Sequence, residues 1–342
     1  MTNKITVMSF ARVAEPREYA DIALGEQELP VNHQLQYINH LGERTAKDAL
    51  EAVEGSNLIL CSGSALDVGK FNQESGEVEP DFQEKTVREL VLFFEFLLIQ
   101  SYQGNPAAEK YLVLANCFSA QSLAFAMVLV DALIEAKADL SAIKSIEDLN
   151  KLHPPEQTWT DQKPAFPIVK TRDTQLGLMK SDITAPHHWI FDQMDHQRGL
   201  LYVHNQAILL EVLEGLQHIR PQILAKRDLA VFQQDDTPVK GVVDLFSYSG
   251  PQSSSEMLAA QPHLDYGKSL KNLINVLKKA MNKPQFAKLF RPGTGGAYPN
   301  GSQRSVEELL IELVESAEDK NGHQAIKNCL NRSMPSDLNR AA

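Results

Sequence analysis

The sequence predicts an α/β protein in which one mainly parallel β-sheet is flanked by helices. Short apolar runs alternate with helix-like stretches along the first half of the chain, the order that βαβ units produce. Residues 111–115 (YLVLA) are apolar throughout, as is typical of a parallel strand buried on both faces. Hydrophobic residues make up 43% of the 342 residues and charged residues 23%, so the chain has enough apolar material for a sizeable core.

The first half of the chain contains five predicted elements. They are strands at residues 5–10, 57–61 and 111–115 and helices at 40–53 and 81–100. Asp81 is a suitable N-cap for the second helix, with Glu84 three residues later as in a capping box. Apolar side chains cover most of that helix's circumference, and a further apolar helix is expected at residues 123–136. Both are therefore expected to lie buried inside the fold.

The second half has a less regular pattern. Residues 151–198 are richer in Pro, Asp, Thr and Lys, and we expect them to form a partly irregular cap or excursion. Helical spacing returns from residue 187 to 224, which includes His204 and His218. Late elements are expected as strands at 229–232 and 239–246 and amphipathic helices at 269–280 and 305–317. The pattern predicts one domain over residues 1–332 and a flexible tail at 333–342.

Charge and cysteine usage exclude several functional classes. The net charge of −11 argues against nucleic acid as a partner, because such binding depends on Lys and Arg contacts to phosphates. Cys61, Cys117 and Cys329 form no CxxC pair, which argues against a disulfide framework and a thiolate zinc site. No secretory signal or uninterrupted apolar stretch of about 20 residues is present. We expect a soluble protein, cytoplasmic as synthesised, without a transmembrane segment, metal or organic cofactor.

The segment most informative about chemistry is residues 111–126 (YLVLANCFSAQSLAFA), where a buried strand turns sharply into a helix. A nucleophile at such a turn lies at the carboxyl end of the sheet, beside backbone N–H groups that can stabilise an oxyanion. The segment resembles a degenerate nucleophile elbow of an α/β hydrolase, with Ser119 at the nucleophile position. Cys117 and Gln121 then stand where that family has small residues, and Gln121 departs from the pattern.

Two later segments add to this resemblance. Residues 240–245 (KGVVDL) resemble a strand that ends in the acid of a catalytic triad, Asp244, and His263 follows in the order Ser, Asp, His. Residues 290–299 (FRPGTGGAYP) faintly resemble a Gly-rich segment of the hydrolase family that includes type VI secretion phospholipases, although Arg291 and Thr294 stand where that family has a histidine and an acid.

The resemblance implies an α/β-hydrolase-like fold and a serine hydrolase acting on a small-molecule ester or a lipid acyl substrate. Ser119 would attack the carbonyl, His263 would take and return its proton, and Asp244 would orient the imidazole. A simple helix N-cap accounts for Ser119 equally well.

Cys117 supports a different hypothesis. The segment LVLANCFSA also resembles the strand-ending cysteine segment of caspase-like peptidases, which would make Cys117 the nucleophile. Those enzymes need a histidine after an earlier strand, and the equivalent turn here, residues 61–64 (CSGS), has none. A buried structural cysteine is the alternative for this position.

The remaining hypothesis is non-enzymatic: a hydrolase-like scaffold that has lost its triad and binds a protein partner. Residues 306–320 (VEELLIELVESAEDK) resemble the acidic block of some translocated bacterial effectors, which implies translocation without a cleavable signal peptide. An amphipathic helix with a solvated acidic face explains the same residues. Residues 187–196 collect three histidines and two aspartates, but they lack the HExxH order of a zinc site and are expected to form an exposed polar helix face.

Overall fold

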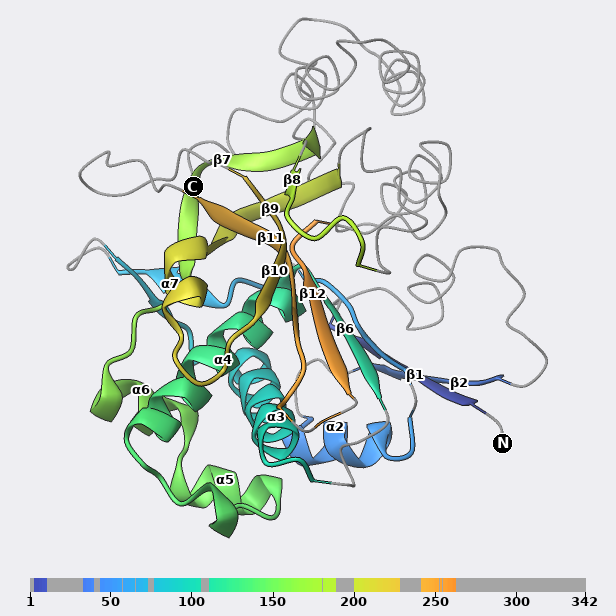
Figure 1. The fold of residues 1–342 in the computed structure, drawn as a ribbon, viewed down its shortest axis with the longest axis vertical. Helices are drawn as coiled ribbons and strands as arrows, with labels where there is room; N and C mark the ends of the chain where they lie inside the picture. Colours follow the sequence, from blue (N-terminus) through green and yellow to red (C-terminus); the bar gives the residue numbers. More distant parts are fainter. Residues whose placement is uncertain are drawn as a thin grey trace, which may run out of the picture.

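The computed structural model describes the chain in twelve stretches, and these form a mixed α/β fold with helices against a large sheet (Figure 1). The described residues are 3–10, 33–39, 44–56, 58–64, 66–72, 77–105, 111–179, 181–188, 200–227, 241–251, 253 and 255–262. The elements predicted at 229–232, 269–280 and 305–317, the Gly-rich segment at 290–299 and the tail lie outside them. So does residue 263, the histidine of the expected triad.

One half of the sheet is parallel. Its strands lie in the order β2-β1-β3-β6-β12, and every neighbouring pair runs parallel. They are β1 (Asn3–Ser9), β2 (His33–Asn39), β3 (Leu58–Cys61), β6 (Leu112–Asn116) and β12 (Glu256–Ala260). The strands predicted near residues 5–10, 57–61 and 111–115 are confirmed. This order is that of a common doubly wound sheet, in which ligands bind beyond the carboxyl ends of the strands.

The other half of the sheet is antiparallel, which corrects the expectation of a mainly parallel sheet. Its strands are β7 (Ile168–Met179), β8 (Asp182–Ile183), β9 (Leu200–Leu209), β10 (Gln222–Arg227) and β11 (Val242–Tyr248). We expected the strand near 239–246, now β11, to run parallel to the first three, but it runs antiparallel to β12. The connection over residues 249–255 is the physical reason, because parallel neighbours need a crossover of about a dozen residues or more.

The helical pattern expected over residues 187–224 is also wrong for the described residues 200–224. This region contains strands β9 and β10 with the short helix α7 (Leu210–Gly215) between them. β9 pairs with β7 along its length, a long-range partner that local spacing of apolar residues cannot reveal. The stretch 151–198 has more regular structure than expected, since it includes the end of α5 (Ile146–Leu152), α6 (Pro155–Gln162), β7 and β8.

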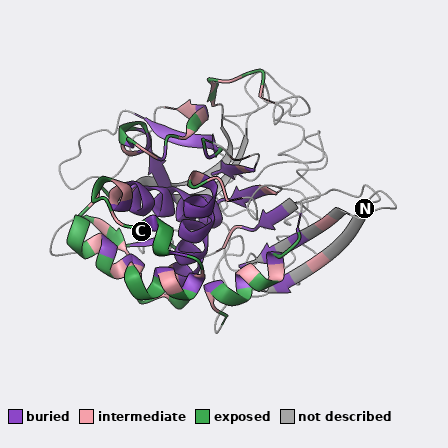
Figure 2. Ribbon diagram, turned by 60° about the horizontal axis from the view of Figure 1, so that its bottom comes forward, coloured by how far each residue is buried: buried purple, intermediate pink, exposed green. Residues whose placement is uncertain are grey.

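Three helices cover one face of the parallel half (Figure 1): α2 (Ala46–Val53), α3 (Lys85–Tyr102) and α4 (Phe118–Glu135). These helices follow β2, β3 and β6 in the chain, and the right-handed connection that parallel strands favour places helices on one side of a sheet with this strand order. α3 and α4 pack on each other, and α5 and α6 contact them from outside. α3 and α4 are therefore buried on nearly all sides (Figure 2). The predicted burial of these two helices is confirmed.

The predicted start of α3 needs a correction. The helix begins at Lys85, and the N-cap is Glu84, whose carboxylate accepts from the backbone N–H of Thr86. Asp81 lies before the helix and pairs with Lys70 at 2.7 Å. The short hairpin β4 (Gly69–Phe71) and β5 (Val78–Pro80) precedes it.

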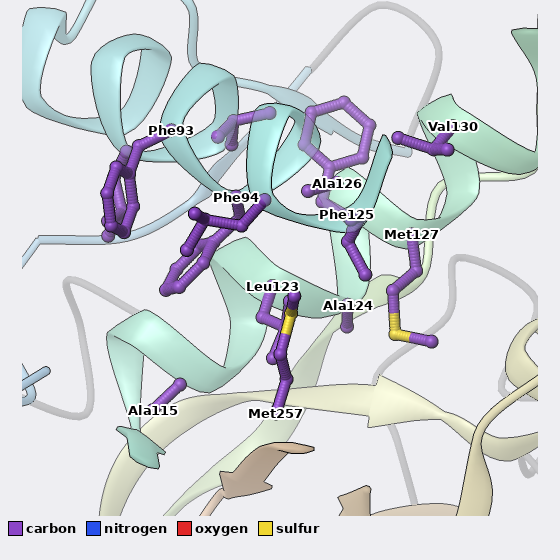
Figure 3. Packing of buried hydrophobic residues seen from close by; sticks show 14 of the residues in the cluster. Phe93, Phe94, Ala115, Leu123, Ala124, Phe125, Ala126, Met127, Val130 and Met257 are labelled. Carbon is purple, nitrogen blue, oxygen red and sulfur yellow. The ribbon is translucent and has the colours of Figure 1, made fainter. Parts of the chain in front are cut away.

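The core lies between α3, α4 and the strands β6 and β12 (Figure 3). Phe93 and Phe94 of α3 and Phe125 of α4 are fully buried. Phe125 also makes edge-on ring contacts with Trp159 of α6 and with Phe166 before β7, which fix the outer elements on α4. Each such side chain contributes about 1.5–3 kcal/mol by burial.

Among the described helices, α4 is long and apolar enough to cross a membrane. In the fold, 83% of its length is buried against the sheet and other helices. Its hydropathy is therefore accounted for by its place in the core.

The structure predicts that Gly250→Ala is strongly destabilising. A Cβ at Gly250 would lie 2.0 Å from the carbonyl oxygen of Ser101 in α3, so backbone must move, at a cost of about 2–4 kcal/mol. Gly215→Ala is the matched control, because its Cβ would meet nothing within 4 Å, and we expect a change within about 1 kcal/mol. Urea unfolding of both variants measures this; equal stability would contradict the packing of residue 250 against α3.

A second prediction concerns Glu95 of α3, whose two carboxylate oxygens are buried without a hydrogen-bond partner. Burial raises the pKa of this carboxyl well above its usual value. The folded state keeps the proton that the unfolded chain releases, so stability falls as pH rises above about 4.3. Glu95→Met should raise the free energy of unfolding at pH 7 by about 1–4 kcal/mol, with a smaller gain at pH 4.

Glu89→Met is the control for Glu95→Met. The Glu89 carboxylate accepts from the backbone N–H of Ala46 at the start of α2 and from Arg88, so its removal should cost about 1–3 kcal/mol. If Glu95→Met destabilises the protein as much as Glu89→Met does, the Glu95 carboxyl has a hydrogen-bond partner in solution, which would contradict this prediction.

Candidate functional site

The loops that follow β1, β3 and β6 meet at the carboxyl edge of the parallel half. The backbone N–H of Phe10 donates to Ser62 Oγ at 2.9 Å, and Ser64 Oγ donates to the carbonyl of Phe10 at 2.8 Å. Ser119 Oγ, in the first turn of α4, donates to the carbonyl of Ser62 at 2.6 Å. The turn between β6 and α4 is therefore held against the loop after β3.

Cys117 alone forms the turn between β6 and α4. β6 ends at Asn116 and α4 begins at Phe118, and Cys117 has φ 51° and ψ −110°. Residues other than Gly, Asn and Asp rarely adopt a positive φ, because Cβ then lies too close to the backbone. The backbone N–H of Cys117 donates to Ala260 at the end of β12, at 2.7 Å. This residue has the strained position that a nucleophile elbow provides.

The placement of Ser119 at the apex of the turn was wrong by two residues. Ser119 is the second residue of α4 and is fully buried. With Cys117 at the apex, the flanking positions are Ala115 and Ser119, which gives the small-x-nucleophile-x-small spacing of an elbow. Scanning for that spacing with cysteine as well as serine at its centre would have found Cys117 from the sequence.

Burial disfavours ionisation of the Cys117 thiol. Burial raises the pKa of Cys117 to about 12, an effect that the N–H of Phe118 opposes and the carboxylate of Asp67 adds to. Only 4% of the residue is exposed. Burial likewise raises the pKa of the Cys61 thiol at the end of β3. A nucleophilic Cys117 therefore needs a base and an opening of its surroundings.

The carboxylate of Asp244 in β11 binds side chains from two other segments of the chain. Its carboxylate accepts from Arg227 Nε at 2.9 and 3.0 Å and from Ser181 Oγ at 2.7 Å, and it is 1% exposed. The carboxylate is thus engaged by a guanidinium on the neighbouring strand β10. Ser119 makes its own hydrogen bond to the carbonyl of Ser62.

Among the described residues, His188 has a partner at the far end of β12 from this turn. His188 Nε2 lies 2.8 Å from Glu256 Oε1, at the start of β12 and so at the opposite end of that strand from Ala260. It follows β8 in a turn, and the polar helix face expected at 187–196 is not described beyond it. Within the described residues, no three His, Cys, Asp or Glu side chains are grouped as metal ligands would be.

Buried amide side chains surround the turn, and local sequence pattern does not predict their contacts. Asn116 Nδ2 donates to the carbonyls of Ala260 and Pro262, at 3.2 and 2.7 Å. Gln121 Nε2 contacts the carbonyl of Gln206 in β9 and Oε1 of Gln261, at 3.5 and 3.4 Å. Gln121 can therefore be buried between the helix and the sheet, because its amide has hydrogen-bond partners there. These contacts tie the exit of β12 to the start of α4.

No family model matches the chain, and no curated protein is significantly similar to it. The function is therefore argued from the geometry of this turn.

The raised pKa of Cys117 predicts a pH dependence of stability. An unfolded thiol ionises near pH 8.5, whereas the folded one keeps its proton, so stability falls as pH rises from about 8.5 towards 12. At pH 10 this loss amounts to about 2 kcal/mol for one thiol. Urea unfolding at pH 7.5 and pH 10 should show a smaller fall for Cys117→Ala than for the wild type. Identical falls would contradict a buried, neutral thiol.

Proposed function

We propose that the protein is a hydrolase of acyl substrates, an ester or a lipid, that uses Cys117 as its nucleophile on an α/β-hydrolase-like scaffold. The observation that supports this most is the backbone conformation of Cys117 at the turn from β6 into α4. Such a conformation costs about 1–3 kcal/mol for a residue other than glycine, and glycine would adopt it without strain. A cysteine at this position is best explained by a use for its thiol.

The chemistry follows from the groups around the turn. After a base takes its proton, Cys117 Sγ attacks the substrate carbonyl and forms a tetrahedral oxyanion. The N–H of Phe118 and the other N–H groups of the first turn of α4 are placed to stabilise that charge. The C–O bond to the leaving alcohol breaks as the base returns the proton, leaving a thioester. Water then attacks the thioester, which releases the acid and restores the thiol.

The mechanism needs a general base beside Cys117. Ser62, Gly63 and Ser64 follow β3 at the position where caspase-like peptidases have their histidine. His263 stays our proposed base, although it lies outside the described residues. The support for it is that Asn116 binds the carbonyl of Pro262, the preceding residue, beside Cys117. Asp244, whose carboxylate accepts from Arg227 and Ser181, stays the proposed acid that orients this histidine.

The second candidate is a catalytically inactive scaffold that binds a protein partner. The burial of Cys117 and Ser119 and the engaged carboxylate of Asp244 favour it. The expectation of translocation rests on residues 306–320, outside the described part of the chain, and stays a prediction.

Substitution of the turn residues distinguishes these functions. Cys117→Ala should abolish hydrolysis of short acyl esters, at least about a hundredfold, because it removes the attacking atom. Cys61→Ala is the matched control: it removes another buried thiol and should leave the turnover largely intact. Circular dichroism checks the fold, and an acyl electrophile selective for thiols should label the wild type at Cys117.

The other outcomes are equally specific. Labelling of Ser119 by a phosphonate probe, with loss of turnover in Ser119→Ala alone, would assign the reaction to the serine. No turnover over a broad ester panel and no labelling of either residue would favour the binding scaffold.

A further inference from the structure

A groove of about 580 Å³ runs along the second half of α4, away from the turn at Cys117. One wall is α4, the other is α7, and residues between α6 and β7 close the floor. Its volume is within the range of known ligand sites. The lining residues are Val128, Asp131, Ala132, Glu135, Gln162, Pro164, Ala165, Glu211, Val212, Gly215 and Leu216.

The α7 wall of the groove is fixed to α4 by one buried carboxylate. Asp131 accepts the backbone N–H groups of Gln217, His218 and Ile219, at 3.1, 2.6 and 2.8 Å. Three such bonds to a carboxylate hold the segment after α7 in a single position. The groove is therefore formed before any partner arrives, which lowers the entropic cost of binding.

The lining of the groove combines an apolar floor with acidic rims. The apolar lining residues that reach the surface are Ala132, Pro164, Ala165 and Val212, whereas Val128 and Leu216 are buried beneath it. Glu135 on α4 and Glu211 on α7 are exposed on the two sides, and none of the lining residues is a lysine or arginine. His218 lies 3.0 Å from Glu135 and is itself partly exposed. Lys163 lies between two lining residues in the sequence but is not among them.

We propose that this groove binds a basic amphipathic helix of a protein partner. Apolar side chains and the methylene stems of lysines would cover the floor, while their ammonium groups meet Glu135 and Glu211. Opposite charges at the rim would set the orientation of the helix and increase its rate of association. This inference does not depend on the chemistry at Cys117.

The test measures binding of a synthetic peptide by fluorescence anisotropy to the full chain. The peptide carries leucine and lysine at helical spacing over about 18 residues, long enough to form a helix. We expect saturable binding that weakens at higher salt, and no binding of the same peptide with glutamate in place of lysine. Glu135→Gln with Glu211→Gln should weaken binding about fivefold or more. Ala165→Trp, at an exposed lining residue, should abolish it by filling the groove.

The double variant Glu51→Gln with Glu54→Gln is the control for net charge. It makes the same change at exposed positions in and after α2, remote from the groove, and should leave the affinity unchanged. Equal weakening by both double variants, or binding that survives Ala165→Trp, would mean non-specific attraction to an acidic protein and would overturn the proposal. Absence of binding to the wild type would also overturn it.

Discussion

The rest of the structure depends on the packing of α3 and α4 between the parallel half of the sheet and the outer helices. Both are apolar around most of their circumference, so neither is stable with a face in water. Burying them requires the sheet on one side and α5 and α6 on the other. α4 contacts β6, β12 and α6, and α3 contacts α5 and α6. The core also encloses the carboxyl of Glu95, whose oxygens have no hydrogen-bond partner and whose pKa is raised by this burial.

The same packing explains the strained turn. α4 starts directly after β6 and must return across the sheet at once, which leaves Cys117 as the single residue that reverses the chain. Hydrogen bonds of its neighbours hold the reversal, since Asn116 binds the exit of β12 and Ser119 binds the loop after β3. The burial of α4 is large compared with a strain of about 1–3 kcal/mol. The fold can therefore hold a thiol in a conformation that it would not adopt by itself.

The two proposed sites lie at opposite ends of α4, and different forces shape them. Cys117 belongs to the first turn, where backbone N–H groups point out of the helix and favour negative charge. The groove follows the second half, where Asp131 fixes the α7 wall and exposed glutamates carry the charge. One buried helix thus supports a chemical centre and a docking surface that can be tested separately.

Local pattern in the sequence was sufficient for the early strands and for the two buried helices. Short runs rich in apolar and β-branched residues near 5–10, 57–61 and 111–115 are typical of buried strands, and the apolar circumference of α3 and α4 favours burial on all sides. The sequence also placed the strand-to-helix turn at residues 116–121, within which Cys117 is found.

Other features depend on contacts between residues far apart in the chain, and only the tertiary structure decided them. β9 is a strand because β7 offers it hydrogen-bond partners, and β11 is antiparallel because its connection to β12 is too short to cross the sheet. Asp244 is engaged because Arg227 lies on the next strand. Cys117 occupies the apex of the turn because β6 stops pairing with β12 at Asn116. Local spacing carries no information on such partners, since they are chosen by the packing of the whole sheet.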